Sequence, residues 1–551
     1  MATPTSSASG GGELKPTLGL TGVTINAMAL IAPGAFLWTT FQSQCAFGAS
    51  SMWASVFVAT LVALATASCY AAFARKYPEA GAGSSYFYSE AAFLEQESHS
   101  RYKFARLSKL IVGIAAHLYY WVYPGVMVAF MGTILIFIGQ LFNPNFATQP
   151  IEQMGLCVLF AAIVGAIAYI GVTGSTMANI VINIIQITAL IVFSVAAILF
   201  RVHHPALAYE HHSALSVISP HGATQLLFQS TIAILLVVGF ESATALAAES
   251  KNPKHDIPRG VILSLVIQAV IFYFFEYFAA NYFIGSHYAG VIDKAGANFS
   301  LIDPKITAIT DPSINQKMYA GGSIVNGYAA AGADSAPIGS FANIIGTWLF
   351  HSAKGGFYFE LIIALTVVLA LIGTALSCLS TGVRVTYAMG KDDELPGFFG
   401  FIHGKFNTPH VGVIILTVVS GLIGAYGVLN SDNLIKIALI SNLGTFMLYG
   451  LTCLVTYIGF SGDKDAPFFS TKLIPIVGVI LNTGLMLGDF YFAFAAPSAT
   501  AATKYDTKCA LGITVGFIIL SFAYLMIRSS IRKEPMLLPP HKSDTLAGGR
   551  A

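Results

Sequence analysis

Apolar residues fill long, nearly uninterrupted runs of this sequence, and short polar stretches separate the runs. A helix needs about 20 mainly apolar residues to cross the roughly 30 Å hydrocarbon layer of a bilayer. Twelve runs are long enough, and they lie near residues 18–41, 51–74, 109–140, 152–172, 178–201, 224–248, 259–284, 357–390, 409–429, 433–459, 472–495 and 510–528. The pattern therefore predicts an all-α polytopic membrane protein with twelve transmembrane helices.

Composition excludes the alternative of several soluble domains, which the length of 551 residues would otherwise allow. Hydrophobic residues make up 55% of the chain and charged residues 10%, against about 25% charged residues in ordinary globular proteins. A net charge of +2 provides no basic surface, so we expect no nucleic-acid partner. The six cysteines are scattered singly, without the spacing of a disulfide framework or zinc site. We expect neither a bound metal nor a cofactor.

The basic residues predict the orientation in the membrane. Twelve spans place both termini on one side, and most of the 28 lysines and arginines fall on that side. Because cytoplasmic connections are enriched in basic residues, segments 1–17 and 531–551 are predicted cytoplasmic tails of a protein in the inner (cytoplasmic) membrane. The first tail lacks the basic start and small-residue cleavage site of a signal peptide, so we expect it to be retained.

Two connections differ from the others. Segment 285–355 is long and rich in Gly, Ala, Ser and Asn, which predicts an outer excursion with the size of a partial lid. Segment 79–95 is short, semi-polar and aromatic. It predicts an amphipathic helix that lies at the inner membrane interface between spans two and three.

The first and sixth spans each contain a residue pattern that interrupts a helix. Pro33 precedes Gly34 in the middle of the first span, and Gly239 lies at a comparable depth in the sixth. Exposed backbone at that depth persists only where it lines a cavity or is buried in protein. Interrupted helices at matching places of two halves indicate the binding site of a secondary transporter. The alternative is a pair of packing glycines, which are frequent in membrane helices.

Three motifs support the first interpretation. Residues 74–86 read ARKYPEAGAGSSY, residues 249–259 read ESKNPKHDIPR, and residues 384–396 read RVTYAMGKDDELP, followed by NTP at 407–409. They resemble, in order and on the predicted side, motifs of the amino acid–polyamine–organocation transporter superfamily, over about residues 18–460. The resemblance implies a LeuT-like bundle of two inverted five-helix repeats, 18–201 and 202–460, with two additional spans in 461–530. It also implies proton-linked transport of amino acids or related amines.

The resemblance also implies a set of substrate-binding residues. In the family the substrate carboxylate docks on a Gly-Ser-Gly-type turn of span one, and the matching residues here are Ala32, Pro33 and Gly34, followed by Ala35 and Phe36. Pro33 has no N–H donor, which leaves room for an amine substrate. Tyrosines on span three either bind an ammonium group by cation–π contact or simply pack. The other candidates are Tyr119, Tyr123, Leu235, Gly239, Phe240, Ser441 and Asn442.

Glu241 is the candidate for proton coupling, because an intramembrane carboxylate is costly and suggests function by default. The alternative is a structural carboxyl that caps the broken backbone of span six. Gln186 occupies the position where some proton-linked relatives carry a lysine in place of sodium. Its amide either bridges spans one and eight, which we favour, or helps to hold a cation together with Ser377, Ser380 and Thr381.

Further polar residues have weaker assignments. The inner motifs contain charges that we expect to form a cytoplasmic gate, namely Glu79, Glu249, Arg259, Arg384 and Asp392. Glu276 lies among aromatic residues that suggest a solvated position at the outer interface. A histidine group either binds metal or, as we favour, belongs to a solvated loop, and it comprises His203, His204, His211 and His212.

These observations together predict a secondary active transporter that moves amino acids or related amines by alternating access. The alternatives are a polyamine or amine exchanger of the same fold and a nutrient receptor that does not transport. An enzyme is disfavoured, because the buried segments contain no nucleophile–base pair and no cluster of metal ligands. The expected partners are a small-molecule substrate, the lipid bilayer and a proton, with sodium less favoured.

Overall fold

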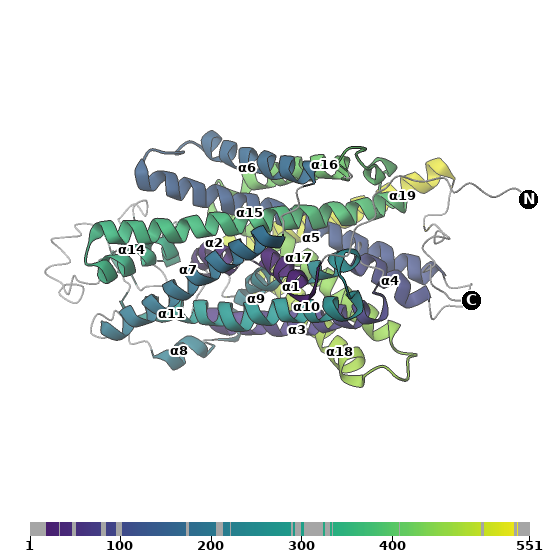
Figure 1. Ribbon diagram of the computed structural model, residues 1–551, viewed down its shortest axis with the longest axis horizontal. Helices are drawn as coiled ribbons and strands as arrows, with labels where there is room; N and C mark the ends of the chain where they lie inside the picture. Colours follow the sequence, from purple (N-terminus) through teal and green to yellow (C-terminus); the bar gives the residue numbers. More distant parts are fainter. Residues whose placement is uncertain are drawn as a thin grey trace, which may run out of the picture.

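The structure, a computed structural model, describes residues 18–31, 33–46, 51–78, 84–94, 102–171, 176–204, 213–220, 222–287, 290–292, 299–301, 323–325, 331–332, 334, 336–406, 408–497, 501–533 and 537. Within these residues, 12 helices or helix pairs are long and apolar enough to cross a membrane. The twelve predicted spans and the all-α membrane architecture are therefore confirmed (Figure 1).

The helices follow the chain in a simple order. They are α1 (Leu20–Ile31), α2 (Pro33–Ala46), α3 (Met52–Lys76), α4 (Ser85–Leu94), α5 (Tyr102–Phe142), α6 (Pro150–Ile170), α7 (Thr176–His203), α8 (Ala214–Ile218), α9 (Ala223–Val237), the 3₁₀ helix η2 (Phe240–Glu249), α10 (Pro253–Val266), the π-helical η3 (Ile267–Tyr273), α11 (Phe274–His287), α14 (Pro337–Phe350), α15 (Ala353–Lys391), the 3₁₀ helix η5 (Gly397–Gly400), α16 (His410–Gly427), α17 (Ser431–Gly459), the π-helical η6 (Phe469–Leu473), α18 (Ile474–Phe494) and α19 (Ala501–Arg532).

The predicted break in the sixth span is present. In the first span α1 ends at Ile31 and α2 begins at Pro33, and Ala32 between them lies outside the described residues. The sixth span divides into α9 and η2 at Gly239, whose φ of 113° is a conformation that residues with a side chain rarely adopt. Glycine is therefore the residue that permits the second break.

The first and sixth spans are joined through their backbones at the end that the sequence predicts to be cytoplasmic, which is called the inner end below. The amide of Leu18 donates to the carbonyl of Glu249 at 2.9 Å, and the amide of Lys251 donates to the carbonyl of Leu18 at 2.8 Å. These bonds form an isolated parallel bridge between the start of α1 and the end of η2. The two interrupted spans therefore lie side by side, as the inverted-repeat prediction requires.

The longest helices, α5 and α15, have 41 and 39 residues and run along the long axis of the molecule (Figure 1). α5 packs against α15, α16 and α17. Large aromatic side chains are fully buried in this region, including Tyr119, Tyr123 and Tyr449. The interior is thus aromatic around the helix breaks.

The described residues of segment 285–355 include regular secondary structure. They contain a three-stranded antiparallel sheet of β1 (Gly290–Ile292), β2 (Phe299–Leu301) and β3 (Ser323–Val325), in the order β2-β1-β3, and then α14. The side chains of Ile338, Phe341 and Ile345 on α14 are buried. Gly339 of α14 approaches Trp38 of α2, which leaves no room for a Cβ atom there. α14 therefore covers the outer half of the first span.

The helix expected over 79–95 is present as α4, but its polar residues are buried in the protein and not exposed as an amphipathic surface helix requires. The described helix, α4, begins at Ser85, and its residues Tyr86, Ser89 and Glu90 are almost completely buried. α4 packs against α5 and α17 and so lies inside the protein. The reason is that its polar side chains are partnered by charges from other helices, described below.

Candidate functional site

The end of α1 lacks intrahelical partners for its last carbonyl groups, as every helix end does. Side chains from η3 and α15 supply those partners at the break. The hydrogen bonds are Gln268 Nε2 to Met28 O (2.7 Å), Tyr273 Oη to Ile31 O (2.8 Å) and Thr374 Oγ1 to Ala29 O (3.1 Å). The break in the first span is therefore stabilised from two neighbouring spans, and it persists at a depth where water cannot satisfy the backbone.

α2 begins beyond this break, in the half of the span on the outer side. The amides of the first helical turn also lack intrahelical acceptors, and the helix dipole makes this end favourable for an anion. Ala35 and Phe36 of α2 are buried, whereas Ala32 lies outside the described residues. The first turn of α2 therefore lies in the protein interior.

Glu241 lies at the second break and is completely buried. Its Oε1 atom accepts a hydrogen bond from the Tyr120 hydroxyl at 3.0 Å. Its Oε2 atom accepts from the Tyr449 hydroxyl at 2.7 Å and from the Gly239 amide at 3.0 Å. All three donors are neutral, and Glu241 forms no ion pair with any residue that the structure describes. The carboxyl group is therefore hydrogen-bonded but has no cation to balance its charge.

Tyr449 was not among the predicted site residues, and Tyr120 was considered only as one of the aromatic residues of span three, not as a partner of Glu241. Tyr120 follows Tyr119 directly, and nothing in the sequence indicates which of the two points to Glu241. Tyr449 lies on α17, 208 residues after Glu241. Only the folded arrangement of α5, η2 and α17 brings these hydroxyl groups together.

Aromatic rings form one wall of the region between the breaks. The ring centroid of Tyr123 lies 6.3 Å from that of Phe36 and 5.2 Å from that of Tyr119. The ring centroid of Phe240, the residue before Glu241, lies 5.3 Å from that of Tyr449. The hydroxyl groups of Tyr119 and Tyr123 are buried and have no hydrogen-bond partner among the described residues. The structure thus brings four aromatic residues into one region, namely Phe36, Tyr119, Tyr123 and Phe240. Two of their hydroxyl groups form no hydrogen bond with a described residue.

Gln186 is buried on α7 and donates to Asn183 at 2.7 Å, and Asn183 donates to the carbonyl of Ile25 in α1 at 3.4 Å. Gln186 is therefore linked to the first span through a second amide, and no bond to α15 is present among the described residues. Thr381 donates to the carbonyl of Ser377 in its own helix at 2.9 Å. Ser377 and Ser380 are half-buried.

The predicted residues of span ten contact the outer half of span six. Asn442 donates to the carbonyl of Thr231 in α9 at 2.8 Å, while its own oxygen and the Ser441 hydroxyl are buried without a partner among the described residues. Leu235 is buried on α9 in the main core. These residues connect α9 to α17.

Other acidic side chains are buried within membrane spans, among them Glu276 and Asp489. Glu276 is 1% exposed, so the expected solvated position at the outer interface is wrong. The tyrosines around it, Tyr273 and Tyr277, bond to α1 and α2 and turn this face of the helix inward. Asp489 on α18 is also completely buried and was not predicted.

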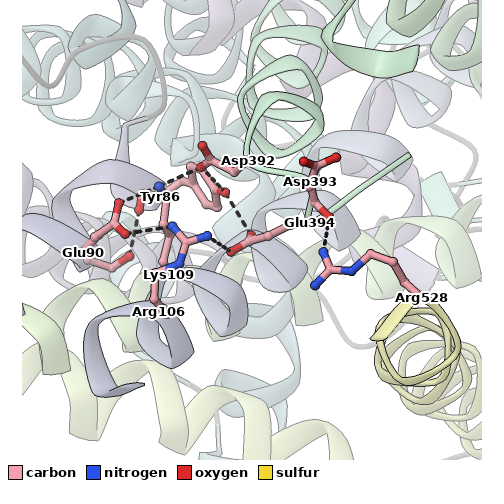
Figure 2. Close-up of polar contacts among 9 residues, drawn as sticks. Tyr86, Glu90, Arg106, Lys109, Asp392, Asp393, Glu394 and Arg528 are labelled. Carbon is pink, nitrogen blue, oxygen red and sulfur yellow. Dashed lines mark hydrogen bonds and ion pairs between the residues drawn. The ribbon is translucent and has the colours of Figure 1, made fainter. Parts of the chain in front are cut away.

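A cluster of charged side chains lies at the inner end of the molecule and joins α4, α5 and the turn after α15 (Figure 2). Lys109 contacts Glu90 at 2.5 Å and Asp392 at 2.7 Å, and Arg106 contacts Glu90 at 2.8 Å and Glu394 at 3.7 Å. The two basic side chains are only 0% and 3% exposed. We call these five residues, together with Tyr86, the charge cluster.

Of the charge cluster, only Asp392 was predicted. Glu90, Arg106, Lys109 and Glu394 were missed because sequence alone does not show that α4 is buried. The available signal was the pair of basic residues placed three apart at the start of an otherwise apolar helix. Such spacing puts both on one helix face.

Glu394 is the group in the charge cluster whose protonation the structure favours. The cluster contains three acids and two bases, so one acid is in excess. Burial raises the pKa of the Glu394 carboxyl to about 7, although Arg106, Lys109 and Tyr86 act in the opposite direction. The Tyr86 hydroxyl lies 2.7 Å from Asp392 and 2.9 Å from Glu394, but it has one proton to donate. A proton on Glu394 supplies the second hydrogen bond.

This arrangement predicts that stability decreases as pH rises. Glu394 has a higher pKa in the folded protein than in the unfolded chain, so the folded state binds more protons between about pH 4.5 and pH 7. Over that window the group should lower the free energy of unfolding by about 3 kcal/mol. The apparent unfolding temperature, followed from pH 5 to 8, should fall in the unmodified protein and change less in Glu394→Gln. Asp465→Asn, at an exposed acid, is the control, and an equally steep decrease in Glu394→Gln would contradict the assignment.

The remaining gate residues behave differently from one another. Arg384 and Glu249 form an ion pair at 3.6 Å, and both are about one-third exposed, a setting in which such a pair contributes about 0–1 kcal/mol. Arg259 is exposed and pairs with no described residue. Glu79 lies outside the described residues.

Two histidines of the predicted group are described. His203 and His204 bond to carbonyls of their own helix, and both rings lie against Trp348. His211 and His212 lie outside the described residues. Within the described part of the chain, His, Cys, Asp and Glu form no group of three that fits a metal ion.

Comparison with known proteins agrees with this geometry. Residues 17–522 match the family model described as "Amino acid permease". The branched-chain amino acid permease BcaP of Bacillus subtilis (strain 168) is 24% identical, over 81% of this chain and 82% of that protein. The methylthioribose transporter of the same organism is 23% identical over 61% and 58%. The low-affinity putrescine importer PlaP of Escherichia coli (strain K12) is 23% identical over 41% and 36%.

Proposed function

Since the chain belongs to the amino acid permease family and is a secondary transporter of amino acids or amines, we propose that its transport is linked to protons through Glu241. The family and its named relatives are transporters, which points to a protein that is not an enzyme. The observation that carries the proposal is the isolation of the Glu241 carboxyl. It is completely buried at a helix break and has three neutral donors, but no cation among the described residues.

An isolated carboxylate in the membrane interior is costly, and two events relieve that cost. One is the uptake of a proton, and the other is the arrival of a cationic group from the substrate. Because both act on the same two oxygen atoms, occupancy by the substrate and by the proton are coupled. This coupling is the physical basis of proton-linked transport at this site.

We propose that the substrate carries an amino group and binds between the two breaks. Its ammonium group would lie near Glu241 and the face of Tyr119 or Tyr123, where a cation–π contact adds about 0.5–2 kcal/mol. A substrate carboxylate, when present, would lie at the first turn of α2. The surrounding Phe36 and Phe240 favour an apolar side chain.

The named relatives include a branched-chain amino acid permease and a putrescine importer, which differ in whether the substrate has a carboxylate. Pro33 removes one backbone donor from the turn that would bind that group. An amine without a carboxylate is therefore a second candidate substrate for this chain.

We further propose that the protein lies in the cytoplasmic membrane with both termini inside. The basic residues of the inner connections support this orientation. The charge cluster and the Arg384–Glu249 pair would then act at the cytoplasmic side, where they hold α4, α5, η2 and α15 together.

Coupling to sodium is disfavoured by the hydrogen bonds that the carbonyl groups at the end of α1 accept. The carbonyls at the end of α1, which would be ligands for a cation, already accept hydrogen bonds from Gln268, Tyr273 and Thr374. We therefore expect uptake at fixed pH to be unchanged when sodium is replaced by an organic cation. Strict dependence on sodium would contradict this expectation.

The experiment that tests the proposal is counterflow in liposomes containing the purified protein. Radiolabelled branched-chain amino acids, other amino acids and putrescine are offered with and without an imposed pH gradient. Flux of one class, accelerated by the gradient, is the expected result. Binding without flux would favour the receptor alternative, and flux that ignores the gradient would remove the proton link.

A further inference from the structure

A lateral apolar groove lies on the outside of the bundle, away from the helix breaks. It consists of two adjoining cavities of about 510 and 310 Å³. The larger lies between α5, α16, α17 and α19, and the smaller lies between α5, α19 and the turn after α15. Both are lined by His117, Trp121 and Phe517, so together they form one continuous feature.

The walls of the groove belong to membrane-spanning helices, and they are almost entirely apolar. On α19, Ile513 and Leu520 are exposed at its edge. Trp121 donates its indole N–H to Thr386 at 3.0 Å, which satisfies the only polar atom of that side chain. The apolar surface of the groove therefore faces the acyl chains of the bilayer.

The two ends of the groove differ in charge. At the outer end, Lys436 is paired with Asp506 at 3.3 Å. At the inner end, α19 continues from Leu525 to Arg528, Arg532 and the exposed Lys533. Arg528 bonds to the backbone of Asp393, as Figure 2 shows, and Arg532 lies 3.2 Å from the Asp393 carboxylate.

Among the described residues outside the charge cluster, basic groups predominate at the inner end. Arg528, Arg532 and Lys533 lie there together with one described acid, Asp393. Glu394 also lines the smaller cavity, but it belongs to the charge cluster, where it is the acid that the structure favours in its protonated, neutral form. A phosphate group is the chemistry that an excess of arginine and lysine at a membrane surface recognises.

We propose that the groove binds an anionic phospholipid, with an acyl chain along Trp121 and Phe517 and the phosphate at Arg532 and Lys533. Because lipid tails are as apolar as the groove, the acyl chain fills the groove but contributes little to the choice between lipid classes. Selectivity comes from the headgroup, at about fivefold for each basic residue near the membrane surface. This site is separate from the transport site and does not depend on the proposed function.

Trp121 provides a direct readout, because brominated acyl chains quench tryptophan fluorescence at close range. The purified protein is reconstituted with brominated phosphatidylglycerol or brominated phosphatidylethanolamine in an excess of unbrominated phosphatidylcholine. Quenching by the phosphatidylglycerol should occur at concentrations at least fivefold lower. The Trp121→Phe variant, which keeps the other three tryptophans, should lose this difference.

The double variant Arg532→Gln/Lys533→Gln should remove the preference for phosphatidylglycerol. The matched control is Lys464→Gln/Lys472→Gln, which removes two basic residues from the inner connection before α18, outside the groove, and should keep it. Equal quenching by both lipids in the unmodified protein would overturn the proposal. So would an unchanged preference in the first double variant, or crosslinking that shows a second copy of the chain seated on α19.

Discussion

Uptake by the Glu241→Gln variant is expected to be nearly independent of pH. The unmodified protein should show a response of up to roughly tenfold per pH unit in the range where one coupling group titrates. Glutamine has nearly the same shape but cannot exchange a proton at this site. It also keeps only one acceptor oxygen for the three donors, Tyr120, Tyr449 and the Gly239 amide, so we expect a loss of about 1–3 kcal/mol in stability.

The control is Glu360→Gln, which makes the same chemical change at another buried acid of a membrane span. Glu360 accepts a hydrogen bond from Asn343 at 2.7 Å and lies away from both helix breaks. Its pH profile of uptake should match that of the unmodified protein. If Glu241→Gln is folded, by gel filtration and thermal unfolding, and keeps the full pH response, Glu241 is not the coupling group.

Gly239→Ala is expected to lower uptake at least tenfold for each folded molecule. The φ of 113° disfavours any residue with a Cβ atom, at about 1–3 kcal/mol. An added Cβ would also lie 2.9 Å from Cγ of Leu30, in the last turn of α1, and such overpacking adds about 1–3 kcal/mol. Because the clash falls on the other broken span, the substitution distorts both breaks together.

Gly373→Ala in α15 is the matched control for this substitution. It lies in a continuous membrane helix, and an added Cβ would meet only a methyl group of Ile182 at 3.9 Å. That variant should be as active and as stable as the unmodified protein. Normal uptake by Gly239→Ala would show that the break at this glycine does not shape the transport site.

Much of the fold was predictable because a bilayer permits few solutions for apolar segments. Runs of apolar residues must become helices, and Pro33 and Gly239 interrupt them for steric reasons that sequence displays directly. The helices and the break at Gly239 were predicted and are confirmed. Glu241 was equally visible, since few charges occur within the spans.

The parts that were missed depend on contacts between distant segments. The buried position of α4 follows from Glu90, whose partners lie on α5, and no local pattern distinguishes it from an interfacial helix. The donors to Glu241 come from α5 and α17 for the same reason. Glu276 was misplaced because aromatic neighbours are common both at membrane interfaces and in packed interiors.

The backbone bridge at Leu18 has a mechanical consequence. Main-chain hydrogen bonds join the start of α1 to the end of η2. A displacement of α1 at that end would therefore displace η2 with it. The Glu249 carbonyl accepts one of these hydrogen bonds, and its side chain forms an ion pair with Arg384 of α15. This residue therefore connects α1 and η2 to α15. Because both hydrogen bonds use only main-chain atoms, substitutions of the surrounding side chains can leave the connection between α1 and η2 in place.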